Sequence, residues 1–251
     1  MAKQKGIIKV QGTIGDITFS KSRFGYIIKE KTTLDKNRFN ADPAFTRTRE
    51  NASEFGKACK ASKLLRTALF ALLKNAKDSD LHTRLVTLLM KVIKADATST
   101  RGFRNVMDGE TEMLQGLEFN NNAQLTNTLY TAYTPTINRA TGLLEIEIPS
   151  FIPADAIIAP AGATHYKMVA AGAEVNFEAG NFVSTTSNST ILPIDTLASA
   201  PLLLSNQVTA NSTSPLFLIM GIQFFQQVND TFYELRNGAF NALSIVSVSG
   251  I

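Results

Sequence analysis

Cysteine and histidine are scarce in this chain of 251 residues, which contains one cysteine, Cys59, and two histidines, His82 and His165. A lone cysteine excludes a disulfide within the chain and a metal cage built from its cysteines, and it suits a reducing compartment. The two histidines fall in different predicted domains, so we interpret both as structural. Cys59 lies on the apolar side of a predicted helix, where a small buried side chain is the usual role.

Long hydrophobic runs are also missing. The longest apolar stretches, residues 64–73 and 215–225, are interrupted and fall short of the roughly 20 residues that a membrane-spanning helix needs. The first residues carry charge but no following apolar run of about 7 to 15 residues, so no secretory signal is visible. We therefore expect no membrane span and a cytoplasmic or virion location.

Positive charge is nearly absent from the second half of the chain. Residues 116–251 hold 3 Lys and Arg against 9 Asp and Glu, a net charge of −6, whereas residues 1–115 hold 22 against 12, a net charge of +10. The total of +4 hides this division. Such asymmetry indicates what each surface attracts. The basic half suits nucleic acid or the acidic half of another copy.

The length suits two domains, because domains commonly have about 100 to 150 residues. A hydrophobic content of 44% and a charged content of 18% are enough for a packed core. The pattern of residues changes at Gly116, from helical periods to short strands. We therefore predict a basic domain at residues 1–115 and an acidic domain at residues 116–251.

The first thirty residues predict a small antiparallel β-meander. Residues 7–10, 17–19 and 26–28 are β-favouring runs. Glycine-containing segments at 12–16 and 21–25 separate them, and glycine permits the positive φ values of tight turns. Strands this short are marginal in water unless one face is covered. The following helix is the nearest candidate for that cover.

Asp42 followed by Pro43 predicts the start of a helix that runs to about residue 76. The Asp42 carboxylate can accept hydrogen bonds from free amides, and Pro43 has no amide hydrogen to lose at the first helical position. Gly56 weakens the middle of the helix by about 1 kcal/mol relative to alanine, so we expect a kink or close packing there. Helical spacing predicts an apolar stripe formed by Phe45, Ala52, Phe55, Cys59, Ser62, Leu65, Leu69, Leu72 and Leu73.

The same helix carries its cations on one side. Successive residues of a helix are about 100° apart around its axis. On this basis a sector about 60° wide contains Arg49, Lys60, Lys63 and Lys74, and beside it lie Lys57 and Arg66. We call this group the basic face; it is a candidate interaction surface formed by Arg49, Lys57, Lys60, Lys63, Arg66 and Lys74.

A second helix is predicted at residues 79–95, and it ends in Lys91 and Lys94, which suit a helix C-terminus. The two helices predict a hairpin. The pattern allows a third short helix around residues 100–114, weakened by its two glycines. The second helix places on one side Leu81, Leu85, Leu88, Leu89 and Val92.

From Gly116 onward the chain predicts strands. Turns rich in Asn, Ser, Gly and Pro separate them, and residues 228–231 predict a hairpin tip. Regular short strands without helical periods predict an antiparallel β-sandwich, Ig-like or jelly-roll-like. The expected fold class is therefore α+β: an N-terminal β-meander with a basic helical hairpin, then a C-terminal sandwich. The predicted strands are residues 117–119, 143–148, 165–171, 174–177, 202–208, 216–228, 231–235 and 243–248.

Catalytic motifs give no positive support for an enzyme. Glu145 and Glu147 point to one side of a predicted strand, and paired carboxylates can serve glycoside hydrolysis. Their alternation with apolar residues is explained more simply as the solvent-facing side of that strand. The chain has neither a phosphate-binding glycine-rich loop nor a dinucleotide fingerprint. We expect no enzymatic activity and no cofactor.

Short segments in both halves of the chain carry a resemblance. They are KGII at 5–8, GTIGDITF at 12–19, GY at 25–26, NADPAF at 40–45, RTREN at 47–51, EFG at 54–56, SKLLR at 62–66 and NGAFNAL at 237–243. Together they resemble a family of uncharacterised proteins from Bacteroidota bacteria. The resemblance implies a bacterial or phage-borne setting and carries over no catalytic residue.

One family-like segment forms a candidate structural polar cluster of Arg47, Arg49, Glu50 and Asn51, within one helical turn. These side chains suit a partner surface or bonds that tie the helix to the β-meander, and we favour the second interpretation.

The unequal charge of the two halves supports two functions. A basic head and an acidic sandwich on one chain favour head-to-tail contact between copies, and the second half has few lysines to guard its strand edges. We therefore predict a non-enzymatic structural protein that self-assembles, as a phage virion component or a filament or lattice subunit. The alternative is nucleic-acid binding by the basic half, whose lysines alternate with Phe19, Phe24 and Tyr26. Unequal charge can also serve solubility alone.

Overall fold

The computed structural model describes residues 2–22, 24–31, 35–76 and 78–251, and the chain is a mixed α+β protein, as the sequence predicts. It divides into two compact units, Met1–Arg49 and Glu50–Ile251, which we call the N-terminal unit and the C-terminal unit. The sequence places a boundary after residue 115 instead. The difference arises because the helices after Arg49 share a hydrophobic core with the C-terminal strands.

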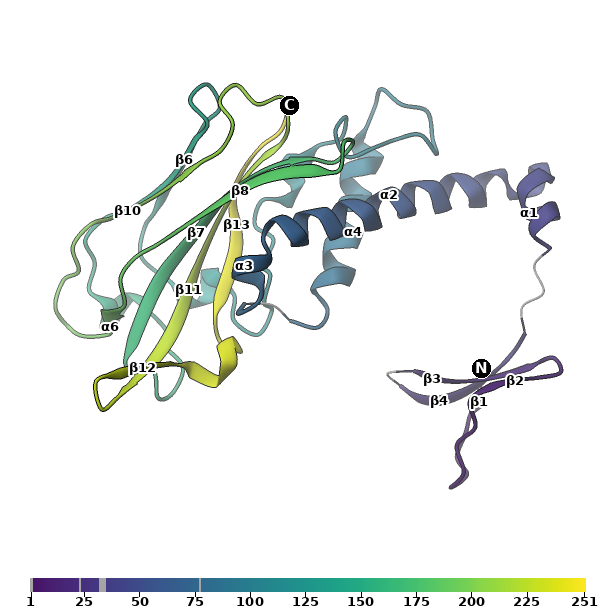
Figure 1. The fold of residues 1–251 in the computed structure, drawn as a ribbon, viewed down its shortest axis with the longest axis horizontal. Coiled ribbons are helices and arrows are strands. Elements are labelled where there is room, and N and C mark those ends of the chain that lie inside the picture. The colour runs from purple at the N-terminus through teal and green to yellow at the C-terminus, as the bar shows by residue number, and fades with distance from the viewer. Residues whose placement is uncertain (1, 23, 32–34, 77) are drawn as a thin grey trace. The chain divides into compact units, whose positions relative to one another are not determined.

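The N-terminal unit contains a four-stranded antiparallel sheet in the order β1-β4-β3-β2 (Figure 1). The strands predicted at 17–19 and 26–28 are confirmed, but the one predicted at 7–10 is wrong. There the Gln4 side chain accepts from the Val10 amide (3.0 Å) and donates to the Val10 carbonyl (3.1 Å), in place of a strand partner. The four strands are β1 (Ala2–Lys3), β2 (Gly12–Ile14), β3 (Ile17–Ser22) and β4 (Gly25–Glu30).

Two short helices follow this sheet, α1 (Lys36–Ala41) and the 3₁₀ helix η1 (Pro43–Phe45). The predicted helix start is confirmed, since Asp42 Oδ1 accepts from the Ala44 amide at 2.9 Å. None of the described residues of the N-terminal unit is buried. The expected helical cover over the sheet is therefore not formed within this unit.

The long helix α2 (Thr46–Ala68) runs through Gly56 without interruption. It ends earlier than predicted: Leu69 has φ −101° and ψ 14°, and α3 (Phe70–Leu73) forms a separate turn. The predicted apolar stripe is wrong in its first half, where Phe55 is 54% exposed. The buried residues of α2 are Glu54, Ala58, Ala61, Ser62, Leu65 and Ala68.

The second predicted helix is confirmed as α4 (Leu81–Ala95), which shares one core with α2 and α3. Leu88 is only partly buried, whereas the other apolar residues of the predicted side are buried: Leu81, Leu85, Leu89 and Val92.

The third helix allowed by the sequence is reduced to the 3₁₀ helix η2 (Thr111–Leu114), and residues 96–110 form a loop, here called the 96–110 loop. Gly102 has a φ of +88°, which does not fit an α-helix. At Gly109 a Cβ would lie 2.4 Å from the carbonyl oxygen of Val92, so the loop approaches α4 closely.

The C-terminal strands form a three-stranded sheet in the order β10-β6-β5 and a six-stranded sheet in which β12-β11-β7-β8 is extended by β13 on β11 and β9 on β7. All pairs are antiparallel, and the strands curl into a half-barrel (Figure 1). The strands are β5 (Thr134–Asn138), β6 (Leu143–Ile148), β7 (His165–Asn176), β8 (Asn181–Asn188), β9 (Leu192–Pro193), β10 (Leu202–Gln207), β11 (Leu216–Val228), β12 (Thr231–Glu234) and β13 (Ala242–Ser249). Short helices connect some of them: α5 (Leu125–Thr128), α6 (Pro153–Ala156) and η3 (Leu235–Gly238).

Most of the predicted strands are confirmed in this half. The runs at 165–171 and 174–177 are one continuous strand, β7, and residues 117–119 form only an isolated bridge. The predicted hairpin tip is confirmed by Asn229 and Asp230, both with positive φ (49° and 60°). Strands β5, β8 and β9 were not predicted.

Alternating side chains divide the C-terminal unit into layers. In β7, Val169, Ala171 and Ala173 pack into the core shared with the helices, whereas Met168 and Ala170 pack into a second core with the three-stranded sheet. Successive side chains of a strand point to opposite faces of its sheet. Helices therefore cover one face of the six-stranded sheet, and the three-stranded sheet covers the other.

Candidate functional site

The first residue of the basic face, Arg49, stabilises the helix start. Its guanidinium donates to the carbonyl of Phe39 (2.7 Å), to the carbonyl of Asp42 (3.0 Å) and to Thr46 Oγ1 (3.2 Å). Three acceptors of this kind fix the side chain in place. Arg49 thus joins α1 to α2 within the N-terminal unit.

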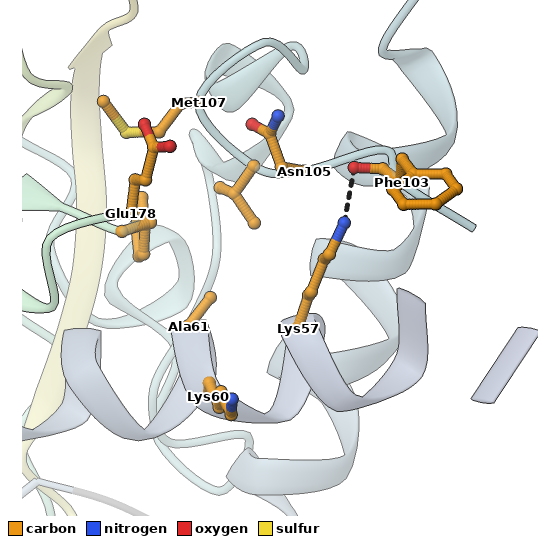
Figure 2. A pocket seen from close by; sticks show the side chains of 9 residues that line it. Lys57, Lys60, Ala61, Phe103, Asn105, Met107 and Glu178 are labelled. Atoms are coloured by element: carbon orange, nitrogen blue, oxygen red, sulfur yellow. Dashed lines mark hydrogen bonds between the residues drawn. The ribbon is translucent and has the colours of Figure 1, made fainter. Parts of the chain in front are cut away.

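Lys57 and Lys60 line a hollow of about 320 Å³ between α2, the 96–110 loop and the turn after β7 (Figure 2). The Lys57 ammonium donates to the carbonyl of Phe103 and, at 2.8 Å, to that of Arg104. Its charge therefore holds the loop against the helix. Lys60 and Glu178, both exposed, lie at the same hollow.

Lys63 and Arg66 line a second, more open groove of about 590 Å³ at the end of the helical hairpin. The ring of Phe70 lies in it and is 65% exposed. His82 also lines the groove, with Nδ1 3.2 Å from Ser62 Oγ. Lys74, the last residue of the basic face, is exposed. The basic face is thus divided between a helix cap, two hollows and an exposed lysine.

The polar cluster bonds in two directions: Arg49 bonds to α1 and to the start of α2, whereas Glu50 and Asn51 bond to the 96–110 loop. Glu50 lies 3.3 Å from Arg101, and Asn51 Oδ1 accepts from the same guanidinium at 2.8 Å. Arg47 is exposed. Glu50 and Asn51 therefore contact a loop of the C-terminal unit, whereas the sequence favours bonds to the β-meander.

A buried ion pair beside this cluster was not predicted. Glu54 is 1% exposed, and its carboxylate accepts from the Gly102 amide (2.8 Å) and from Arg104 Nε (2.7 Å) and a terminal nitrogen (2.9 Å). Burial alone would raise the pKa of Glu54, but these bonds and the charges of Arg104 and Arg101 outweigh it and lower the pKa. The spacing in the sequence could have indicated that Glu54 is buried, because Glu54 lies on the same helical face as Ala58, Ala61 and Leu65.

Asp96 organises the start of the 96–110 loop. Asp96 is 4% exposed, and its carboxylate accepts from the Thr98 amide and hydroxyl and the Ser99 amide, each at 2.9 Å, and from the Asn105 amide at 3.1 Å. Burial would raise the pKa of Asp96, but these four bonds hold it well below its usual range.

Acid is expected to destabilise the C-terminal unit through these carboxyl groups. Asp96, Glu54 and Asp78 all have a lower pKa in the folded chain, so they stabilise it above the unfolded pKa, near 4, and this contribution is lost as pH falls through the folded values. Glu118, whose pKa burial raises, acts in the opposite sense. Urea unfolding at neutral and acidic pH should show a lower free energy of unfolding in acid.

The matched variant is Asp96→Asn, which keeps the size of the side chain but cannot titrate. Its stability should depend less on pH than that of the natural sequence. An equal pH dependence in both proteins would contradict the role given to Asp96.

The other candidate residues have structural surroundings. The His165 ring lies edge-on to Phe232 with the centroids 4.8 Å apart, and Cys59 packs partly buried against the helical core. Glu145 and Glu147 lie on the outer side of β6, as predicted. Within the described ranges there is no group of three or more His, Cys, Asp and Glu side chains arranged to hold a metal ion. Nor does any helix there have the length and hydrophobicity to cross a membrane.

The sheet of the N-terminal unit has one apolar face, here called the apolar face. In the register of β2, β3 and β4, Ile14 is opposite Ile17, and Phe19 is opposite Ile28. These four side chains share one side with Tyr26, Lys21 and Glu30, while the other side carries Thr13, Thr18, Ser20, Ile27 and Lys29. Ile14 is 66% exposed and Ile17 48%. Adjacent apolar side chains on one side of this sheet are thus open to solvent within this unit.

Basic side chains lie on the apolar face and beside it. The ammonium groups of Lys9 and Lys21 both lie 5.8 Å from the centroid of the Tyr26 ring. The whole N-terminal unit holds 11 Lys and Arg against 4 Asp and Glu, a net charge of +7. In comparisons with known proteins, no family model, no curated protein and no solved structure matches the chain. Function is therefore inferred from these surfaces.

Proposed function

We propose that this chain is a non-enzymatic structural protein that assembles with copies of itself, as a phage virion component or a subunit of a cellular filament or lattice. The observation that carries the proposal is the apolar face: none of the described residues of the N-terminal unit is buried, although its sheet has the alternation of a half-buried sheet. Such alternation is typical of a sheet that packs against another layer.

The N-terminal unit has little to stabilise it alone. A domain below about 60 residues already buries a small share of its surface, and a short sheet needs packing on one face to persist in water. Contiguous exposed apolar side chains with a charged border are typical of protein interaction sites. A partner layer over the apolar face supplies the missing core.

Charge favours a second copy as that partner. The N-terminal unit carries +7, and residues 116–251 carry −6, so opposite charges meet when the first part of one copy contacts the β region of another. The two surfaces differ, and head-to-tail contacts between different surfaces build rings or filaments. In this proposal the two C-terminal sheets form the β-sandwich of such a subunit, located in the cytoplasm or in a virion.

Size-exclusion chromatography with light scattering tests the proposal. The average mass of the natural chain should increase with protein concentration and fall when salt screens the complementary charges. A species that stays monomeric at every concentration, in low and in high salt, would contradict self-assembly.

Nucleic-acid binding is the second candidate, and it is supported by the groove at Phe70. An exposed aromatic ring beside Lys63 and Arg66 fits a mode in which a base stacks on the ring and the cations contact phosphates. Phe70→Ala should then weaken binding of a labelled single-stranded DNA, measured by fluorescence anisotropy. Phe103→Ala is the matched control, since Phe103 is 75% exposed in the other hollow. Equal binding by both variants would remove this candidate.

A further inference from the structure

Resting on the proposed self-assembly, we infer that the apolar face of one copy docks on the outer face of the β10-β6-β5 sheet of a second copy. This outer face, here called the acceptor face, is defined by the register of the three strands: Thr134 opposite Glu147, Glu147 opposite Leu203, and Glu145 between Thr136 and Ser205. All six side chains point away from the core of the half-barrel.

The acceptor face is the sheet surface that the rest of the C-terminal unit leaves open. One face of the six-stranded sheet packs on the helices, and its other face packs on the inner side of the three-stranded sheet. The outer side of the three-stranded sheet has no further layer over it in the described part of this unit. Leu203, on the edge strand β10, is 62% exposed, and Glu147, Thr134 and Thr136 are exposed.

The chemistry of the two faces is complementary. The apolar face has an aliphatic centre with Lys9 and Lys21 at Tyr26 and one acid, Glu30. The acceptor face has Leu203 opposite Glu147, and Glu145 lies on the same side of β6. Strands β5, β6 and β10 contain no Lys or Arg. Face-to-face packing of two sheets buries side chains between the layers. An aliphatic centre suits this contact better than it suits bases, which stack on aromatic rings.

A charge swap between copies tests the docking. Glu147→Lys places a lysine opposite the Lys21 region, and Lys21→Glu places a glutamate opposite Glu147, so each variant alone should associate about tenfold or more weakly than the natural chain. An equimolar mixture should recover natural association, because each contact then joins opposite charges. Sedimentation velocity of the full-length chains measures all three samples. Glu178→Lys changes the net charge equally at an exposed site outside the acceptor face and should associate normally.

The outcomes separate this inference from the proposed function. If Glu147→Lys associates like the natural chain while Lys21→Glu is weakened, or if mixing restores nothing, docking on the acceptor face is wrong and self-assembly stands. If the natural chain itself is monomeric, the proposed function fails. Recovery in the mixture supports both.

Discussion

Chains that carry Ile14→Asp together with Ile17→Asp are expected to stay monomeric at concentrations where the natural sequence assembles. Both isoleucines lie side by side on the apolar face, 66% and 48% exposed. Covering half-exposed side chains of this size contributes about 1 to 2 kcal/mol each, so losing both weakens association by about 30-fold to 1,000-fold. Burying two carboxylates without partners adds to the loss. Sedimentation velocity of each purified chain measures the change.

A matched pair of substitutions separates a docking surface from general solubility. Ile158 and Leu197 are 61% and 72% exposed in the C-terminal unit, away from the acceptor face. Ile158→Asp with Leu197→Asp should leave association unchanged, although it adds the same two charges. If both double variants lose association equally, or if neither does, the apolar face has no special role.

Replacing Glu54 by alanine should lower the free energy of unfolding by about 2 to 3 kcal/mol. Removing one partner of a buried ion pair costs about 3 to 5 kcal/mol of stability when water does not reach the remaining charge. The Arg104 side chain is 19% exposed, so water compensates part of the loss. The amide of Gly102 loses its acceptor in the same variant. Urea unfolding followed by circular dichroism measures the difference.

Glu50→Ala is the control for Glu54→Ala, because it removes a glutamate from the same helix that also pairs with the 96–110 loop. The Glu50–Arg101 pair is more exposed, at 25% and 42%, so its loss should cost only about 0 to 1 kcal/mol. An equal loss in the free energy of unfolding for the two variants would contradict the larger contribution assigned to Glu54.

Local signals in the sequence were sufficient for many elements. Asp42 and Pro43 mark a helix start through bonds that form within three residues, and Asn229 and Asp230 mark a hairpin because both tolerate positive φ. The alternation along β6 likewise determines which side Glu145 and Glu147 occupy. In each case the stabilising contacts lie close together in the chain.

Contacts between distant segments could not be predicted. The helical stripe fails at Phe55 because the buried side of α2 includes Glu54 instead, whose partners Gly102 and Arg104 lie about fifty residues later. The basic face was predicted as a set of charges, but the acceptors for Lys57 are carbonyls of the same distant loop. Sequence spacing gives the angular position of a lysine, and it does not show which carbonyl approaches it.

The most direct measurement is photo-cross-linking from the apolar face. A photoreactive phenylalanine analogue in place of Phe19 is introduced into a light-isotope chain, which is mixed with a heavy-isotope chain and irradiated, and cross-linked peptides are identified by mass spectrometry. We predict light–heavy pairs that join position 19 to peptides containing Glu147 or Leu203. Cross-links confined to one chain, or an absence of cross-links between chains at every concentration, would contradict it.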